Sequence, residues 1–287
     1  MLSNVSLRER DFIESGVAKG VRLDGRAPHE FRRLRIVSGD LPHASGSARA
    51  TVGSTDVLAV VKAELVPCGS GGSGGVGDTA GSSAGARSVG AVDVSALVHT
   101  TSAAGGRRAD DGAELAAALQ RLLSAPGIID FDALVALPGA WAWHLSVDLV
   151  VSASDGGVLD VAAAATAAAL RTTRLPKLRA VKTEGGAELK LDDNPAAFDV
   201  LPFCNSLPVV VTLQHMRGFA LVDATALEEA CSTGAVSVGI GPTDRVCFMS
   251  ARGSGLTPKV LHEGLLAAVG CAQRVRDAIT AFEASNR

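Results

Sequence analysis

The chain contains 287 residues, of which 47% are hydrophobic and 20% are charged, and its net charge at neutral pH is −3. A chain of this length and composition can bury a large core, so a disordered protein is excluded and one large domain or two small ones are expected. The near-neutral charge excludes the global positive field of an independent nucleic-acid binder, but it leaves local basic patches open.

The first predicted element is a helix over residues 7–18. Ser6 and Glu9 form a capping box at its start, and Gly20 follows its end. The polar turn 21–26 then leads into a region of strand character.

Residues 31–99 predict several strands interrupted by one loop. Patterns of apolar and β-branched residues predict strands over 31–37, 48–52, 57–66 and 91–99, and the second and third of these form a hairpin. The intervening segment 69–90 is rich in glycine and serine and has little to bury, so we expect a flexible loop. It lacks the Gly-Lys-Ser/Thr ending of a P-loop, which argues against a phosphate cradle.

The remaining residues predict five strands and, apart from a short helix near residue 228, three helices. Leucines at helical spacing predict a helix over 112–123, and the segment 158–170 predicts a helix so rich in alanine that it must pack closely against a sheet. Thr257 and Pro258 predict the start of a long carboxyl-terminal helix. The predicted strands cover 141–154, 208–213, 219–222, 235–240 and 246–250. The order of strands and helices indicates an α+β fold with mixed sheets and packed helices.

Neither the cysteines nor the histidines form a metal-binding motif. The five cysteines show no C-x-x-C spacing, the six histidines show no HxH or HxxxH grouping, and no serine lies in a G-x-S-x-G motif. We therefore predict no metal and no cofactor. The amino terminus lacks the apolar core of a signal peptide, and the longest apolar run is too short to span a bilayer, so we expect a soluble intracellular protein without a membrane partner.

The stretch LVDATALEEAC places acidic residues where two interpretations apply. Asp223 ends an apolar run, and Glu228 and Glu229 begin a predicted helix. Neighbouring carboxylates can share acid and base chemistry or hold a divalent metal. Alternatively, Asp223 simply ends a strand while the glutamates favour the positive end of the helix.

Several segments together resemble the RNase PH-type subunits of the eukaryotic RNA exosome. They are RLDGR at 22–26, SGSAR at 45–49 with GSTD at 53–56, DGG at 155–157 followed by the alanine helix, and LVDATALEEAC at 221–231. The resemblance spans roughly residues 5 to 275. It implies the RNase PH fold, a ribosomal-protein-S5-like βαβα arrangement, with 1–30 as an amino-terminal helix and arm, 31–175 as a first half containing the loop 69–90, and 176–287 as a second half.

The resemblance also implies a reaction and the residues that would perform it. In active relatives, inorganic phosphate attacks the RNA 3′ end, and two aspartates six residues apart match Asp223 and Glu229 here. Arginines that hold phosphate in active relatives match Asp110, Asp111 and Ala117. We therefore expect Asp223 and Glu229 to be relics and the chain to be a non-catalytic ring subunit; the alternative is an active phosphate-dependent 3′ to 5′ exoribonuclease that uses these two carboxylates.

The expected partners follow from the same resemblance. They are other RNase PH-type subunits in a six-membered hetero-oligomeric ring, S1/KH cap subunits, an associated exoribonuclease and single-stranded RNA, in the nucleus, nucleolus and cytoplasm. Arg107 and Arg108 follow two glycines and are either contacts for the RNA backbone or part of a solvated loop. Arg121, Arg171 and Arg174 favour salt bridges to neighbouring subunits over ligand contacts.

Overall fold

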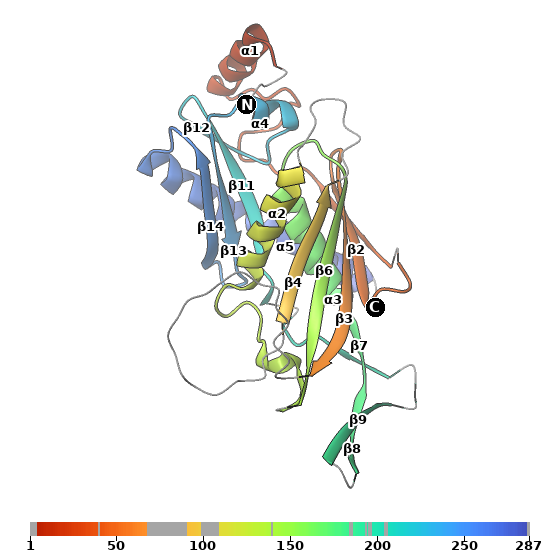
Figure 1. Ribbon diagram of the computed structural model, residues 1–287. Helices are drawn as coiled ribbons and strands as arrows, with labels where there is room; N and C mark the ends of the chain where they lie inside the picture. The colour runs from red at the N-terminus through yellow and green to blue at the C-terminus, as the bar shows by residue number, and fades with distance from the viewer. Residues whose placement is uncertain are drawn as a thin grey trace.

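The computed structural model describes residues 5–39, 41–67, 91–98, 109–138, 140–183, 186–192, 194, 197–203 and 206–285. These residues form two main sheets with helices packed around and between them (Figure 1). The segment 69–90, predicted to be a flexible loop, and the candidate RNA-binding pair Arg107 and Arg108 lie outside the described residues.

The first sheet has six strands in the spatial order β1-β2-β3-β6-β4, with β5 paired to β6. The strands are β1 (Leu34–Ser38), β2 (Gly46–Val52), β3 (Thr55–Pro67), β4 (Ala91–Val98), β5 (Val135–Leu137), which follows the short 3-10 helix η1 (Asp132–Leu134), and β6 (Trp141–Ala153). All pairs are antiparallel except β4 with β6. The predicted hairpin is confirmed by β2 and β3, which pair from Val52 and Thr55 onward.

Helix α2 (Ala109–Leu123) packs beside strand β4 and protects its free edge. The side chain of Gln120 donates to the carbonyl oxygen of Val92 at 2.7 Å and accepts from the amide of Val94 at 2.9 Å, as a neighbouring strand would. The predicted leucine face is confirmed, because all four leucines of α2 are buried: Leu115, Leu119, Leu122 and Leu123.

The second sheet is antiparallel and has the order β12-β11-β13-β14. Its strands are β11 (Val209–Met216), β12 (Phe219–Val222), β13 (Gly234–Ile240) and β14 (Val246–Gly253). The short helix α4 (Ala226–Cys231) joins β12 to β13, and the long helix α5 (Pro258–Ser285) packs against β11, β12 and β13.

Helix α3 (Val158–Thr172) joins the two sheets. It contacts β2 and β3 of the first sheet and β11 of the second, and its residues from Val158 to Leu170 are buried except for Leu159. Because alanine side chains are small, the helix can approach both sheets closely, and one continuous apolar core connects them. This confirms the close packing predicted from the alanine run and fixes the amino end of α3 between the sheets.

Helix α1 (Leu7–Ala18) has its own small core, built from Ile13, Val17, Met216, Leu221 and Cys231. The predicted capping box is confirmed: the hydroxyl of Ser6 accepts from the Glu9 amide at 3.3 Å, and the Glu9 carboxylate accepts from the Ser6 amide at 2.9 Å.

Four short strands between α3 and the second sheet had no counterpart in the sequence prediction. Strand β7 (Arg174–Pro176) pairs with β10 (Phe198–Val200), and β8 (Leu178–Thr183) pairs with β9 (Gly186–Leu191) in a hairpin that projects from the body (Figure 1). Strands β7 and β10 have three residues each and are too short to display a two-residue alternation. No helix in the described ranges is long and apolar enough to cross a membrane.

Candidate functional site

The acidic turn between β12 and α4 is folded around Asp223. This residue adopts a left-handed backbone conformation, with φ of 50°, and only 1% of its surface is exposed. Aspartate tolerates this conformation better than most residues because its short polar side chain bonds locally. The turn ends at Thr225, whose hydroxyl accepts from the Glu228 amide and caps α4.

The carboxylate of Asp223 is held by two arginines. From Arg32, Nε donates to Oδ2 at 2.9 Å, Nη2 donates to Oδ1 at 2.7 Å, and the backbone amide donates to Oδ2 at 2.8 Å. From Arg26, Nη1 donates to Oδ2 at 3.0 Å. The ion pair with Asp223 contributes to raising the pKa of Arg32, against the opposing effect of burial. Both carboxylate oxygens are therefore engaged in structural contacts.

A second buried ion pair stabilises the other side of the same turn. Arg22 donates to the Glu228 carboxylate through Nε at 3.0 Å and through Nη2 at 2.6 Å, and it also donates to the carbonyl oxygens of Val222 and Asp223. The two arginines of the RLDGR motif, Arg22 and Arg26, thus fix the loop after α1 to the β12–α4 turn. A planar guanidinium with several donors suits this bridging role.

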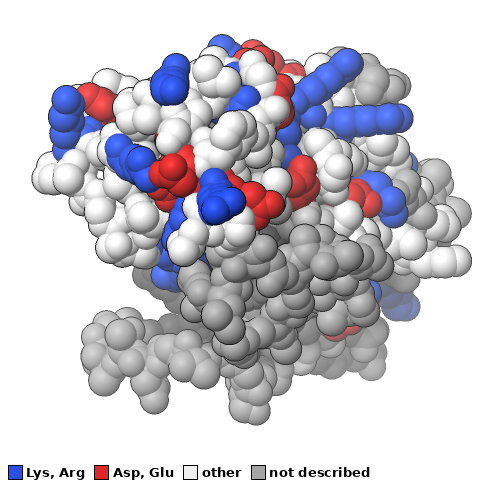
Figure 2. All heavy atoms as spheres, turned by 90° about the horizontal axis from the view of Figure 1, so that it is seen from above, with Lys and Arg blue, Asp and Glu red and all other residues white. Residues whose placement is uncertain are grey.

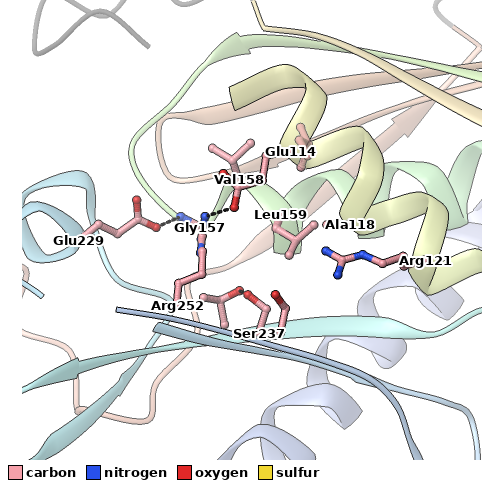
Figure 3. A pocket seen from close by; sticks show the side chains of 12 residues that line it. Glu114, Ala118, Arg121, Gly157, Val158, Leu159, Glu229, Ser237 and Arg252 are labelled. Carbon is pink, nitrogen blue, oxygen red and sulfur yellow. Dashed lines mark hydrogen bonds and ion pairs between the residues drawn. The ribbon is translucent and has the colours of Figure 1, made fainter. Parts of the chain in front are cut away.

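A cleft of about 210 Å³ opens at the amino end of α3 (Figure 3). Its lining comes from α2, the start of α3, α4 and the second sheet: Glu114, Leu115, Ala118, Arg121, Gly157, Val158, Leu159, Thr212, Glu229, Ser237, Ser250 and Arg252. The cleft contains charged groups of both signs and several hydroxyl groups.

Glu229 belongs to α4, but its carboxylate lies at the start of α3 and forms a hydrogen bond there. Its Oε1 accepts from the backbone amide of Gly157 at 2.8 Å (Figure 3). Gly157 is the residue that caps α3, and its φ of 63° is left-handed. The first amides of a helix carry partial positive charge and favour anions, so the Glu229 carboxylate occupies a position suited to an anion.

The arginines of the cleft also have intramolecular contacts. Arg252 donates to the Glu114 carboxylate at 3.0 Å, joining β14 to α2 (Figure 3). Arg121 lies over the ring of Phe248 at 5.7 Å, and its Nε donates to the carbonyl oxygen of Ala117 at 3.3 Å. Asp110 and Asp111, which the resemblance matched to arginines of active relatives, are in the first turn of α2, and Ala117 is exposed on the same helix.

The structure brings the two predicted relics together at Gly157. A Cβ atom added to Gly157 would lie 3.1 Å from Oδ1 of Asp223, while Glu229 accepts the amide of the same residue. The sequence patterns did not indicate four neighbours of this site: Arg26, Arg32, Glu114 and Arg252. The RLDGR motif was the available signal for Arg26. No set of His, Cys, Asp or Glu residues in the described segments could hold a metal ion.

Comparisons with known proteins agree with this architecture. The family model for RNase PH, described as the 3′ exoribonuclease family, domain 1, matches residues 30–176. An exosome complex component Rrp42 from Pyrobaculum aerophilum is 32% identical over 237 residues, covering 81% of this chain and 79% of the relative. An exosome complex component RRP45A from Arabidopsis thaliana is 27% identical over 289 residues, covering 97% and 88%.

Solved structures show the same likeness. The archaeal exosome core superimposes with a TM-score of 0.74 at 26% identity, covering 94% of this chain and 96% of that chain. The Archaeoglobus fulgidus exosome with RNA bound to the active site gives a TM-score of 0.72 at 26% identity, covering 93% and 96%. These comparisons confirm the resemblance and the α+β fold predicted from the sequence.

Proposed function

This chain belongs to the RNase PH family of 3′ exoribonucleases, and from that membership we propose that it is a non-catalytic subunit of an exosome core. It would complete a ring of RNase PH-type subunits and help to guide single-stranded RNA. The observation that carries the proposal is the hydrogen bond between Glu229 and the amide of Gly157.

Phosphorolysis needs an inorganic phosphate at the reacting end of the RNA. The amino end of α3 suits an anion, but the carboxylate of Glu229 accepts the Gly157 amide at 2.8 Å. A phosphate would have to displace this carboxylate or bind beside it, and two negative groups at such a distance repel each other. The arrangement therefore disfavours phosphate in the cleft.

Asp223 is poorly placed for proton transfer. Its carboxylate accepts four hydrogen bonds from Arg26 and Arg32, and it is almost completely buried. A general acid or base must reach the substrate within hydrogen-bond distance. Because these contacts engage both oxygens, Asp223 supports the fold of the turn.

Relatives named as exosome components and structures of exosome cores support membership of a hetero-oligomeric ring. Figure 2, viewed from the end that carries α1, shows basic and acidic side chains interspersed among the described residues of this face. RNA would therefore be held by the assembled ring, with S1/KH cap subunits and an associated exoribonuclease as further partners. We propose the nucleus, nucleolus and cytoplasm as its locations.

The decisive assay measures phosphate-dependent release of nucleoside diphosphates. The purified chain is incubated with a 3′-labelled single-stranded RNA, magnesium and phosphate, and a parallel reaction omits phosphate. We expect no nucleoside diphosphates. The alternative is an active exoribonuclease that uses Asp223 and Glu229. It would be established if nucleoside diphosphates are released only with phosphate and their release is lost in Glu229→Gln. The release should persist in the control Asp148→Asn, because Asp148 lies on the first sheet away from the cleft. Release of monophosphates alone would identify a contaminating hydrolase.

Ring membership has a separate test. The endogenous protein is purified under mild conditions, and its mass and companions are determined. We expect several different RNase PH-type subunits in one particle. Recovery as a monomer or homodimer would contradict the ring, and imaging of the tagged protein would test the proposed locations.

A further inference from the structure

One buried carboxylate beneath the cleft has no role in the proposed function. Asp160 lies in the first turn of α3, and 3% of its surface is exposed. Its Oδ2 accepts from the amide of Thr212 at 2.8 Å, and its Oδ1 is 2.6 Å from the Thr212 hydroxyl. The Thr212 hydroxyl is 3.0 Å from that of Ser237. This chain of polar groups connects α3 to β11 and β13.

Asp160 has no basic partner within the described part of the chain. Negative groups approach it from two other elements: Asp223, which follows β12, and Glu229 of α4. The thiol of Cys271 on α5 also interacts with it. Asp223 is itself paired with Arg32, whose guanidinium donates to both oxygens of that carboxylate.

Other elements around the cleft and in the first sheet also carry charged side chains. Across the cleft, α2 contributes Glu114 and Arg121, and β14 contributes Arg252, which pairs with Glu114. On β2 and β3, Arg49 and Asp56 pair with each other. None of these arginines forms a salt bridge with Asp160, so an ionised Asp160 would be a buried charge without a counter-ion.

Burial raises the pKa of Asp160 to about 8, with smaller increases from Asp223 and Glu229, while the hydrogen bonds from Thr212 partly oppose the rise. The neutral acid can keep the same geometry, because its proton can be donated to the Thr212 hydroxyl, which then donates to Ser237. Ionisation removes that proton and leaves a charge that is best stabilised by water.

The nearest route for water is the cleft, because both residues that connect to Asp160 line it. Thr212 and Ser237 are buried themselves, and each lies in the lining of the cleft. Hydration of the ionised carboxylate would therefore separate the first turn of α3 from β11. Gly157, whose amide donates to Glu229, is the N-cap residue immediately before that turn.

We propose that Asp160 is a pH-dependent latch, which ties α3 to β11 beneath the cleft when it is neutral and loosens this tie when it ionises. The latch depends on the fold and not on the proposed role in an exosome. It makes the shape of the cleft responsive to pH near neutrality.

The sign of the pH dependence follows from the direction of the shift. Asp160 is neutral in the folded protein up to a pH of about 8, whereas its ordinary value when unfolded is 3.8. Between these values unfolding releases one proton, so the unfolding constant rises about tenfold for each pH unit. Stability is therefore lost as the pH rises through this window and levels off above the folded pKa.

The test compares Asp160→Asn with the parent chain by urea unfolding at pH 5.5 and 7.5. Asparagine keeps the shape and can bond Thr212, but it does not titrate. The ratio of the parent's unfolding constant to the variant's should rise about 100-fold over these two pH units. The matched control, Asp148→Asn, should keep the parent's slope, because its exposed pairing with Lys62 lowers the pKa of Asp148. A ratio that stays flat for Asp160→Asn would overturn the latch.

A measurement on the parent chain keeps the proposal testable even if Asp160→Asn fails to fold. The carboxyl ¹³C resonance of Asp160 should titrate with a midpoint near 8, and protection of the Thr212 amide from hydrogen exchange should fall through the same midpoint. Thr212→Val removes one donor to the ionised form and should move the midpoint upward. An Asp160 carboxyl that is already ionised at pH 6, or Thr212 protection that is independent of its ionisation, would refute the proposal.

Discussion

Replacing Arg32 with alanine should destabilise the protein strongly, because Arg32 neutralises a carboxylate that cannot reach water. The guanidinium donates two hydrogen bonds to Asp223, and a third bond to the carbonyl oxygen of Asp155 links the β12–α4 turn to the start of α3. Side-chain exposure is 10% for Arg32 and 1% for Asp223. After the substitution, Asp223 would keep its contact with Arg26 but lose its main counter-charge.

Removing one partner of a buried ion pair costs about 3–5 kcal/mol, because the other charge stays buried. Since Arg26 remains 3.0 Å from the carboxylate, we expect a loss near the lower end, about 3 kcal/mol. Arg32→Lys should lose less than Arg32→Ala, because lysine keeps the charge but cannot bond both oxygens with a planar fork. Asp223→Asn in the Arg32→Ala background should recover part of the loss by removing the unpaired charge.

Urea unfolding followed by circular dichroism would give these free energies, provided that the slope with urea is unchanged. The matched control is Arg252→Ala, which breaks a pair whose side chains are 56% and 58% exposed and should cost less than about 1 kcal/mol. If Arg32→Ala and Arg252→Ala lose the same small amount of stability, the Asp223 network does not stabilise the turn.

Three further substitutions or deletions test other parts of the interpretation. Gly156→Ala should lower the free energy of unfolding by at least about 2 kcal/mol more than Gly127→Ala. Both glycines have φ of 81°, but an added Cβ at Gly156 would lie 2.2 Å from the Ala224 carbonyl oxygen, whereas at Gly127 it meets open space. Equal losses in urea unfolding would contradict this close approach. Deleting 71–86 should leave thermal unfolding unchanged, and a fall of more than about 5 °C, on the order of 1 kcal/mol, would show that the segment is ordered. Replacing Arg107 and Arg108 with glutamate should weaken RNA binding by assembled rings and reduce the log–log salt slope by at least about 1.4, and an unchanged slope would assign the pair to a solvated loop.

Patterns within a short stretch of sequence predicted the helices that are stabilised by contacts among neighbouring residues. The capping box of Ser6 and Glu9 and the buried leucine face of α2 depend on residues within a few turns of one helix. The alanine helix was predictable because its composition is incompatible with solvent on any side. In each case, the residues that determine the structure are close together in the chain.

The contacts that define the site are not local, and this explains why the sequence did not predict them. Arg32 and Asp223 are separated by 191 residues, and Arg22 and Glu228 by 206. Each acid could have paired with any of the 27 basic residues, and only the packing of α3 between two sheets selects the partners. The motif RLDGR indicated a family, but its physical task became clear only when its arginines were seen around the β12–α4 turn.

The arrangement at Gly157 separates two carboxylates that looked alike in the sequence. Asp223 points into an arginine network, so its charge contributes to the stability of the turn, whereas Glu229 points into the cleft and accepts from the amide of Gly157, the N-cap residue of α3. Other charged side chains around the cleft also make contacts within the chain: Arg252 forms a salt bridge with Glu114, and Arg121 lies over the ring of Phe248. A catalytic cleft keeps such groups available for substrate and the transition state. Here the polar groups join α2, α3, α4 and the second sheet, which is the arrangement expected of the scaffolding role that we propose.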